Sequence, residues 1–381
     1  MAARVGAPYR RGMQFSRLTA VVTLSSALLV TACTGAQDGS DGVSTTSASG
    51  ASDTATSTEG TDAGAATSAP AEDDAASTTT AMTTDESAAV LSVEEAEQVA
   101  TTLLANRQKA YTTSQQWIKK AQQKAYMSTA RTAAAAEARL ARALDQKVAA
   151  AEDPGEANVL AISREDGKRP IFLFVQSVPK SGVPVLHLME SRTGETKDFR
   201  IIWEASMLPG TEIPTFDRRS VGTPVLRSGK GDLVEAPRDV LKKLAAFISY
   251  PQPEDKPDYK TNGYAAAVRK AASKQADAVS DQASLREKNW LVSEDTKVLM
   301  FEDGSALVLG ALLRDTTFDI KDNAVLNAPD TFRVFTDDGE LTDQAVLRTS
   351  VFVAMRVPSK ETGGEPVLLA AREQLVDAWG S

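Results

Sequence analysis

One segment of the chain has almost nothing to bury, and it limits how much of the protein can fold. Residues 34–89 are mainly Ser, Thr, Ala, Gly, Asp and Glu. They include no Lys, Arg or aromatic residue, and Val43 and Met82 are their only large apolar side chains. Such a composition cannot offset the entropy lost on ordering. We therefore expect residues 33–89 to be a disordered tether and residues 90–381 to fold.

The residues before this segment have the pattern of an export signal. Residues 1–17 carry four Arg and no acidic residue, and residues 18–31 are uncharged and mostly apolar or small. This is the basic and then apolar order of a signal peptide, and the apolar run is short for a membrane span. We expect residues 1–32 to be removed. The pair Arg10-Arg11 lacks the rest of a twin-arginine pattern, so general secretion is favoured.

The run Val30-Thr31-Ala32-Cys33 resembles the lipobox of bacterial lipoproteins, and Cys33 is the only cysteine. The resemblance implies cleavage before Cys33 and acyl lipid, such as palmitate, on that residue. Two acyl chains would anchor the protein stably to the outer face of the cell membrane. A plain secretory signal and an uncleaved anchor are the alternatives. A single thiol also excludes an internal disulfide and argues against thiol catalysis.

The charge is unevenly distributed along the chain. The formal net charge is −9, with four Arg in the signal and ten acidic residues in residues 34–89, which leaves −3 for residues 90–381. The folded part is therefore near neutral. We find no run of basic residues of the kind that indicates nucleic acid binding.

Helical patterns open the folded part. Ser92 can cap a first turn while Glu95 reaches back to it, which is the S-x-x-E capping box. Helical spacing then predicts helices over residues 93–111, 117–125 and 128–151. We expect these helices to pack against the fold, because no sustained heptad indicates a coiled coil.

After Pro154 the apolar period changes to two, which predicts strands. The expected strands are residues 159–163, 171–178, 183–190 and 199–205. After the Pro- and Gly-rich residues 208–231 the plan repeats, with helices over residues 237–250 and 263–285. The expected strands there are residues 290–292, 297–301, 306–313, 331–335, 345–357 and 366–373.

These patterns predict an α+β fold with two helix-then-antiparallel-sheet units, residues 90–230 and 231–381. A cystatin-like or nuclear-transport-factor-like sheet is the expected shape. Three runs, Asp166–Leu173, Phe199–Pro214 and Asp303–Val308, are similar in order to landmarks of actinobacterial secreted lipoproteins that share an extracellular domain of unknown function. The likeness covers most of residues 90–381. It implies no catalytic residue, because that family has no established activity.

Candidates for chemistry are few. His187 is the only histidine. It alternates with Leu186 and Leu188, so we expect a half-exposed strand residue; a base or metal ligand would need carboxylates that the sequence does not place. Gly222 lies too far from the run Ser228–Gly231 for a phosphate loop, and Gly231 replaces its hydroxyl residue.

Two acidic sets lack the alternating ligands and central glycine of an EF-hand. They are Asp315, Asp319 and Asp322, and Asp337, Asp338 and Glu340. We expect neither a metal nor another cofactor. Trp117, Trp203 and Trp290 lie on apolar stripes and are expected in the core rather than on a sugar-stacking surface. Trp379 could close the last strand or be exposed.

These features favour a lipid-anchored, non-enzymatic binding or scaffold module for an envelope protein or a wall component. Two alternatives remain. One is a carrier of a lipid or hydrophobic ligand. The other is an enzyme that uses a single buried carboxylate of raised pKa.

Overall fold

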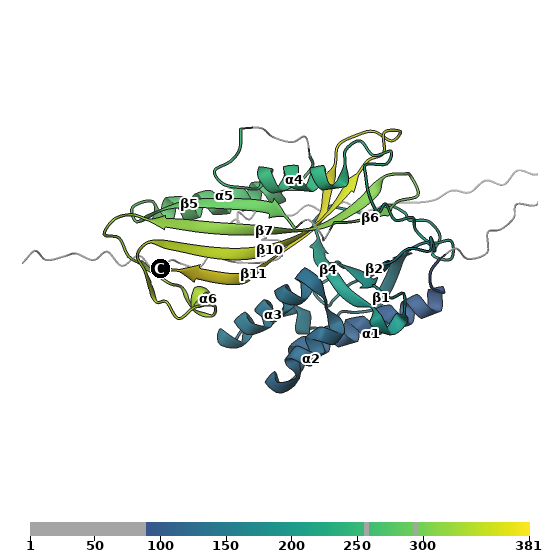
Figure 1. Cartoon of the computed structure of the whole chain (residues 1–381), viewed down its shortest axis with the longest axis horizontal. Helices are drawn as coiled ribbons and strands as arrows, with labels where there is room; N and C mark the ends of the chain where they lie inside the picture. The colour runs from purple at the N-terminus through teal and green to yellow at the C-terminus, as the bar shows by residue number, and fades with distance from the viewer. Residues whose placement is uncertain (1–88, 255–258, 293–295) are drawn as a thin grey trace, which may run out of the picture. The chain divides into compact units, whose positions relative to one another are not determined.

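The fold is seen in a computed structural model that describes residues 89–254, 259–292 and 296–381 (Figure 1). All of these residues belong to one compact unit. The predicted signal peptide, the tether up to residue 88 and Cys33 lie outside the described residues.

A nine-stranded antiparallel sheet is the centre of this unit, with the strand order β1-β2-β3-β4-β11-β10-β7-β5 and with β6 also paired to β7. Its strands are β1 (Ala157–Ile162), β2 (Ile171–Ser177), β3 (Val185–Ser191), β4 (Arg200–Met207), β5 (Ala283–Leu291), β6 (Lys297–Met300), β7 (Ala306–Ile320), β10 (Gln344–Val357) and β11 (Val367–Gly380). A second, two-stranded sheet consists of β8 (Leu326–Asn327) and β9 (Glu340–Leu341). The predicted α+β class with antiparallel strands is confirmed.

The last strand joins the two halves of the sequence. β11 pairs with β10 along its length and with β4 at only two positions, Ala370 with Met207 and Ala371 with Ser206. Segments on both sides of residue 230 therefore contribute to one sheet. The domain limits 90–230 and 231–381 stay a prediction.

Helices cover the sheet in two groups. They are α1 (Val93–Thr112), α2 (Gln115–Ala125) and α3 (Ser128–Ala143) near β1–β4, and α4 (Pro237–Phe247) and α5 (Tyr264–Val279) near β5 and β7. Short turns of helix are η1 (Ala149–Ala151), η2 (Thr196–Asp198) and α6 (Asp330–Arg333). In Figure 1 the first group lies on the opposite side of the long strands from α4.

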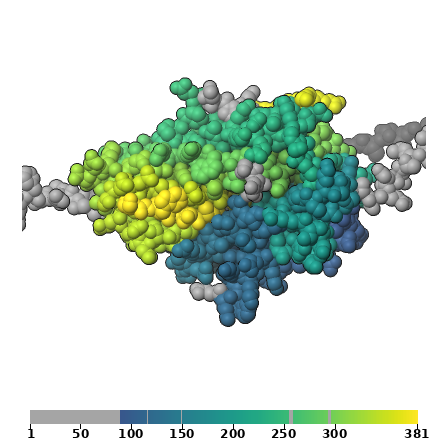
Figure 2. All heavy atoms as spheres, in the orientation of Figure 1, coloured from purple at the N-terminus to yellow at the C-terminus, as the bar shows by residue number. Residues whose placement is uncertain are grey.

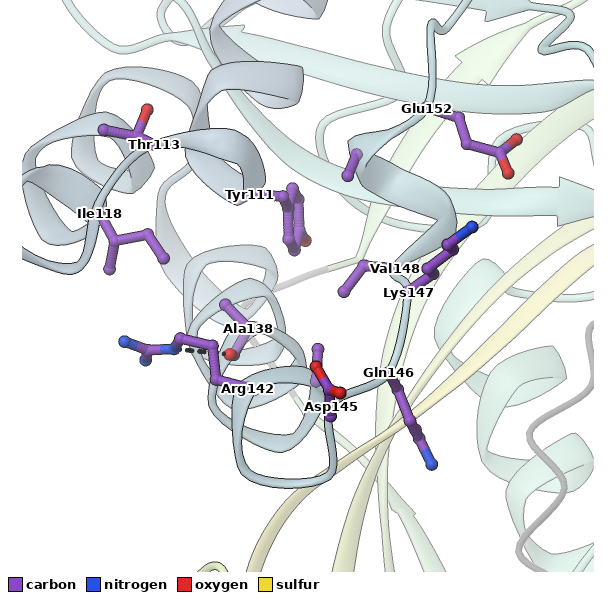
Figure 3. A pocket seen from close by; sticks show the side chains of 12 residues that line it. Tyr111, Thr113, Ile118, Ala138, Arg142, Asp145, Gln146, Lys147, Val148 and Glu152 are labelled. Carbon is purple, nitrogen blue, oxygen red and sulfur yellow. Dashed lines mark hydrogen bonds between the residues drawn. The ribbon is translucent and has the colours of Figure 1, made fainter.

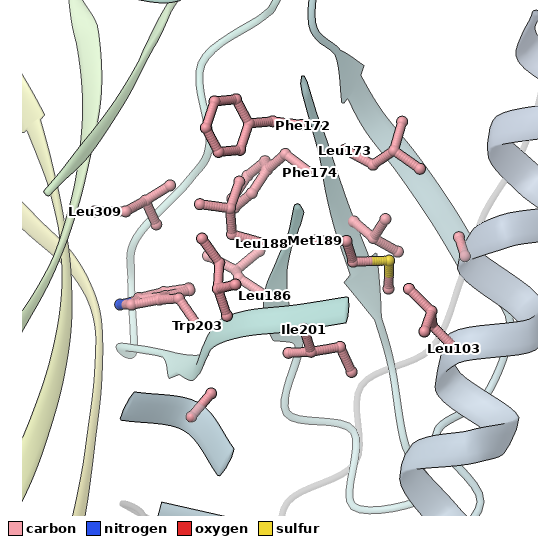
Figure 4. Packing of buried hydrophobic residues seen from close by; sticks show 14 of the residues in the cluster. Leu103, Phe172, Leu173, Phe174, Leu186, Leu188, Met189, Ile201, Trp203 and Leu309 are labelled. Carbon is pink, nitrogen blue, oxygen red and sulfur yellow. The ribbon is translucent and has the colours of Figure 1, made fainter. Parts of the chain in front are cut away.

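The strands β1–β4 are packed on both faces. Figure 4 shows Leu173 and Met189 directed towards Leu103 of α1, while Trp203 lies on the side of β7, where Leu309 is found. The Nε1 atom of Trp203 donates a hydrogen bond of 3.0 Å to the carbonyl of Gly310 in β7. The expectation that Trp203 is a core residue is confirmed, since it is 3% exposed.

Several predicted elements differ from the structure in kind or in length. The predicted helix over residues 128–151 ends at Ala143, and the predicted strand over residues 290–292 is the end of a longer strand, β5. Residues 331–335 were expected as a strand, but Asp330–Arg333 is a helical turn in which the backbone N–H groups of Phe332 and Arg333 bind the carbonyl of Pro329. The β-branched and aromatic residue types of Thr331–Phe335 made this turn resemble a strand. The expected helix to residue 285 ends at Val279, because alternating burial begins at Ala283 and starts β5.

Ser92→Ala tests the first helix. Ser92 Oγ accepts from the Glu95 backbone N–H at 3.1 Å, and Glu95 Oε2 accepts from the Ser92 backbone N–H at 3.0 Å, as the capping box predicts. Losing the cap should lower the free energy of unfolding by about 1 kcal/mol, measured by urea denaturation. Thr102→Ala, an exposed change within the same helix, should not destabilise the protein; equal losses from both changes would contradict a capping role.

Candidate functional site

A carboxylate is buried where the helices meet the sheet. Glu204 of β4 is 1% exposed. Its Oε2 accepts a hydrogen bond of 2.8 Å from Arg107 Nε, and its Oε1 accepts one from the guanidinium of Arg372. Burial alone would raise the pKa of Glu204, but the charges of Arg107 and Arg372 hold this pKa well below its usual range. The group therefore stays ionised.

The network extends to the third helix and is balanced in charge. Arg372 also donates 2.7 Å to Glu137 Oε2 of α3, and the hydroxyl of Tyr111 of α1 donates 2.7 Å to the same oxygen. Two guanidinium groups thus face two carboxylates. Such a set ties α1, α3, β4 and β11 together, because removing one member would leave an unpaired buried charge.

His187 lies inside this network, so the prediction of a half-exposed histidine is wrong. Its side chain is fully buried, with Nε2 at 3.0 Å from Ser177 Oγ and Nδ1 at 3.4 Å from Glu204 Oε2. The alternation with Leu186 and Leu188 was correct, but both faces of β3 are covered. Burial lowers the pKa of His187, and the nearby Glu204 opposes this only in part.

A second buried cluster lies on the side of α5. Arg314 binds both carboxylate oxygens of Glu373, and the Tyr264 hydroxyl donates 2.6 Å to Glu373 Oε1. Glu287 accepts from Thr316 at 2.9 Å, while its other oxygen has no hydrogen-bond partner. Burial raises the pKa of Glu287, although the charge of Arg314 acts against this. It is the residue type that an enzyme with one buried acid would require.

Two hollows open on the surface. One, of about 420 Å³, lies between the helices; Figure 3 shows Tyr111, Ile118 and Arg142 around it. The other, of about 790 Å³, lies between β1 and residues 211–219. Charged side chains line both hollows, and Glu287 lines neither of them.

The long strands carry a third feature, a row of aromatic and charged side chains on one face. Arg348 of β10 lies between two indoles, with its guanidinium carbon 5.5 Å from the ring centre of Trp290 in β5 and 4.8 Å from that of Trp379 in β11. Asp315 of β7 accepts two hydrogen bonds of 2.8 Å from Arg348. We call the face that carries these four residues the open face.

Neighbouring positions on the open face are polar and mostly paired. Arg286 lies 3.3 Å from Asp319, which also accepts 2.8 Å from Gln344. Trp379 is 37% exposed. In Figure 2 the yellow atoms of the C-terminal strand lie at the surface beside the blue helices, without another element over them.

The tryptophans therefore divide into three environments. Trp203 is in the core, as expected. Trp290 is only half-buried, on the open face, so the expectation that it is a core residue is wrong. Trp379 is exposed on the same face, which is one of its two expected positions. The expectation that Trp117 is a core residue is wrong, because it is 47% exposed. The apolar residues of α2 face inwards, whereas Trp117 shares the outer side of the helix with Lys120, whose Nζ lies 4.7 Å from its ring centre.

The other predicted candidates are not gathered into a metal site. Among the described residues, no group of three or more His, Cys, Asp or Glu is placed to hold a metal ion. Asp315 and Asp319 bind Arg348 and Arg286 instead. Gly222 has a positive φ of 81°, and a side chain there would meet backbone atoms of Ala89 and Arg164 at 2.9 Å. This glycine therefore allows three segments of the backbone to pack closely together.

A scan against models of known protein families finds no match, and a search of curated proteins finds no relative. Within the described part of the chain, no helix is both long enough and apolar enough to cross a membrane.

The buried histidine should make stability depend on pH. Because burial lowers the pKa of His187 below its usual value near 6.5, the unfolded chain binds the proton more readily. The stabilising contribution of neutral His187 should therefore be complete above pH 6.5. The free energy of unfolding should decrease as the pH falls from 6.5 towards the lower pKa of the folded state, by up to about 1.4 kcal/mol per pH unit.

His187→Gln should remove this slope, since His187 is the only histidine. The measurement is urea unfolding of both proteins between pH 5 and 7.5. Each protein is its own reference at pH 7.5, because the glutamine also changes packing. A variant that keeps the full slope of the parent would show that His187 is not its source.

Proposed function

We propose that this protein is a lipid-anchored, extracytoplasmic binding module, without catalytic activity, that holds another envelope protein against its open face. The observation that carries the proposal is the stack of Arg348 between Trp290 and Trp379 on an uncovered part of the sheet. The lipobox-like run at Cys33 supports the anchor. The likeness to actinobacterial lipoproteins supports the same location.

The chemistry of the open face suits a protein partner. Trp and Arg contribute more binding energy at protein interfaces than most other residues. The charges beside them are largely paired within the face: Arg348 with Asp315, and Arg286 with Asp319. A partner would therefore meet a surface of little net charge that carries one exposed and one half-buried indole.

The stack is also fixed before any partner arrives. Its members stand on β5, β7, β10 and β11, which are neighbours in one sheet. Hydrogen bonding to Asp315 holds the Arg348 guanidinium and raises its pKa. Binding would then order few side chains, which reduces the entropy lost on association.

A carboxylate-only enzyme is the second candidate, and one observation favours it. Glu287 is buried with a raised pKa and has one oxygen without a hydrogen-bond partner. Carriage of a hydrophobic ligand has less support, because charged residues line both hollows described above.

For the shape of the sheet, our proposal is a cystatin-like or nuclear-transport-factor-like curl in the part formed by β1–β4.

The anchor is tested by Cys33→Ala. Without the thiol no diacylglycerol can be attached, so we expect the variant to be released or to remain unprocessed. Membrane fractionation and intact mass of the protein from its native host measure this. A variant that stays in the membrane fraction with a normal mature mass would rule the anchor out.

The open face is tested by photo-cross-linking on intact cells. A photoreactive residue at Lys288, an exposed position next to Trp290 in β5, should give a reproducible adduct with one envelope protein. Trp379→Ala should reduce the yield of this adduct at least tenfold, since a tryptophan buried by a partner commonly contributes about 2 kcal/mol of binding free energy.

Val178→Ala is the control, because it removes another exposed large apolar side chain, just after β2, and should leave the adduct unchanged. Circular dichroism and urea unfolding confirm that both variants fold. An adduct that also forms from Lys180, in the turn after β2, or that survives Trp379→Ala, would contradict docking at the open face.

A further inference from the structure

Positive charge is concentrated at the corner formed by the end of α1 with α2 and α3. Residues 109–147 contain eight Lys and Arg against Glu137 and Asp145, a net charge of +6, whereas residues 90–381 together carry −3. All eight cationic side chains are exposed. We call this set the basic corner: Lys109, Lys119, Lys120, Lys124, Arg131, Arg139, Arg142 and Lys147. Figure 1 shows α2 and α3 at the lower edge of the molecule.

These charges are not neutralised from within the described chain. Glu137 is already engaged by Arg372 and Tyr111. No described carboxylate forms an ion pair with any member of the basic corner, although Arg142 bonds a carbonyl of its own helix and Arg139 lies over the ring of Phe335. The corner therefore presents an excess of positive potential to an approaching anion.

An aromatic residue stands among these cations. Trp117, Lys120 and Lys124 follow each other along the exposed side of α2 at helical spacing. Among the large hydrophobic side chains of the described residues, only Val178, at 49%, is more exposed than Trp117, at 47%. An indole beside lysines matches the interfacial zone of a bilayer, where tryptophan is enriched and lysine meets phosphate headgroups.

We propose that the basic corner docks on an anionic lipid surface, with its cations against the phosphates and the Trp117 indole in the headgroup layer. A soluble polyanion would satisfy the lysines equally well. It would offer no interfacial layer for the indole, and this favours lipid.

The position of the corner allows this docking together with the anchor, a point that rests on the proposed function. The described chain begins at Ala89, near the start of α1, while the basic corner lies at the other end of this 20-residue helix. That separation is about 30 Å. The 55 residues between Cys33 and Ala89 could extend well beyond this distance, at about 3.3 Å per residue, so the anchor would not keep the corner from the surface that holds the lipid.

The test uses the expected mature chain, residues 33–381 with Cys33→Ala, so neither an acyl chain nor the basic and apolar signal contributes and the result does not depend on the anchor. Co-flotation should show binding to vesicles of phosphatidylcholine with 30% phosphatidylglycerol that exceeds binding to phosphatidylcholine alone and weakens with salt. Lys119→Glu, Lys120→Glu and Lys124→Glu together should reduce this excess about a hundredfold, at roughly fivefold per lysine.

The matched control carries Lys180→Glu, Lys270→Glu and Lys274→Glu, which change three exposed lysines outside the corner, and it should bind like the parent. Brominated lipids should quench part of the tryptophan fluorescence, and Trp117→Phe should abolish that part. Equal loss in both triple variants, no preference for anionic vesicles, or no quenching at Trp117 would overturn the proposal. Binding of soluble polyphosphate in place of vesicles would overturn it as well.

Discussion

The carboxylate of Glu204 is the point on which the arrangement of layers depends. The strands β4 and β11 pair at only two positions, so backbone hydrogen bonds alone give a narrow junction between the first and last parts of the folded chain. Arg372 reaches across this junction to Glu204, and Arg107 reaches it from α1. A buried ion is tolerated only with such partners, so the helices and both strands must hold one mutual position. Glu373, which follows Arg372 in β11, points to the opposite face of the sheet and binds Arg314. This second buried ion pair fixes the strands on the side of α5 in the same way.

This junction also explains why part of the sheet is uncovered. β4 has 8 residues, whereas β7 and β10 have 15 and 14. At about 3.3 Å per residue, the short strands extend roughly 26 Å and the long ones nearly 50 Å. The curled strands β1–β4 therefore cover only the half of β7 and β10 near Leu309, where Trp203 is bound. The other half carries the open face. Its row of Trp290, Arg348 and Trp379 is where a strand-length mismatch leaves polar and aromatic side chains in solvent.

Local patterns predicted much of this structure, and long-range pairing was what they could not supply. The capping box at Ser92, the strands β1–β4 and most of β10 follow from spacing within a few residues. Nothing near His187 in the sequence announces Glu204, because it is the register of β3 against β4 that places the two residues side by side. The Arg107 that binds Glu204 comes from a helix some 80 residues before His187. Alternation showed that His187 and Leu186 occupy opposite faces, but not that both faces are covered. For Trp117, helical spacing gave the element but not which side of an 11-residue helix packs.

The two proposed surfaces differ in how they use charge, and this separates their physical behaviour. On the open face, Arg348 and Arg286 are paired with Asp315 and Asp319, so attraction there depends mainly on contact area and on the indoles. Salt should affect such a surface little. The basic corner keeps a net charge of +6 and leaves −9 for the rest of residues 90–381. That separation gives the folded part a strong dipole despite its near-neutral total, so an anionic surface would orient the protein before contact.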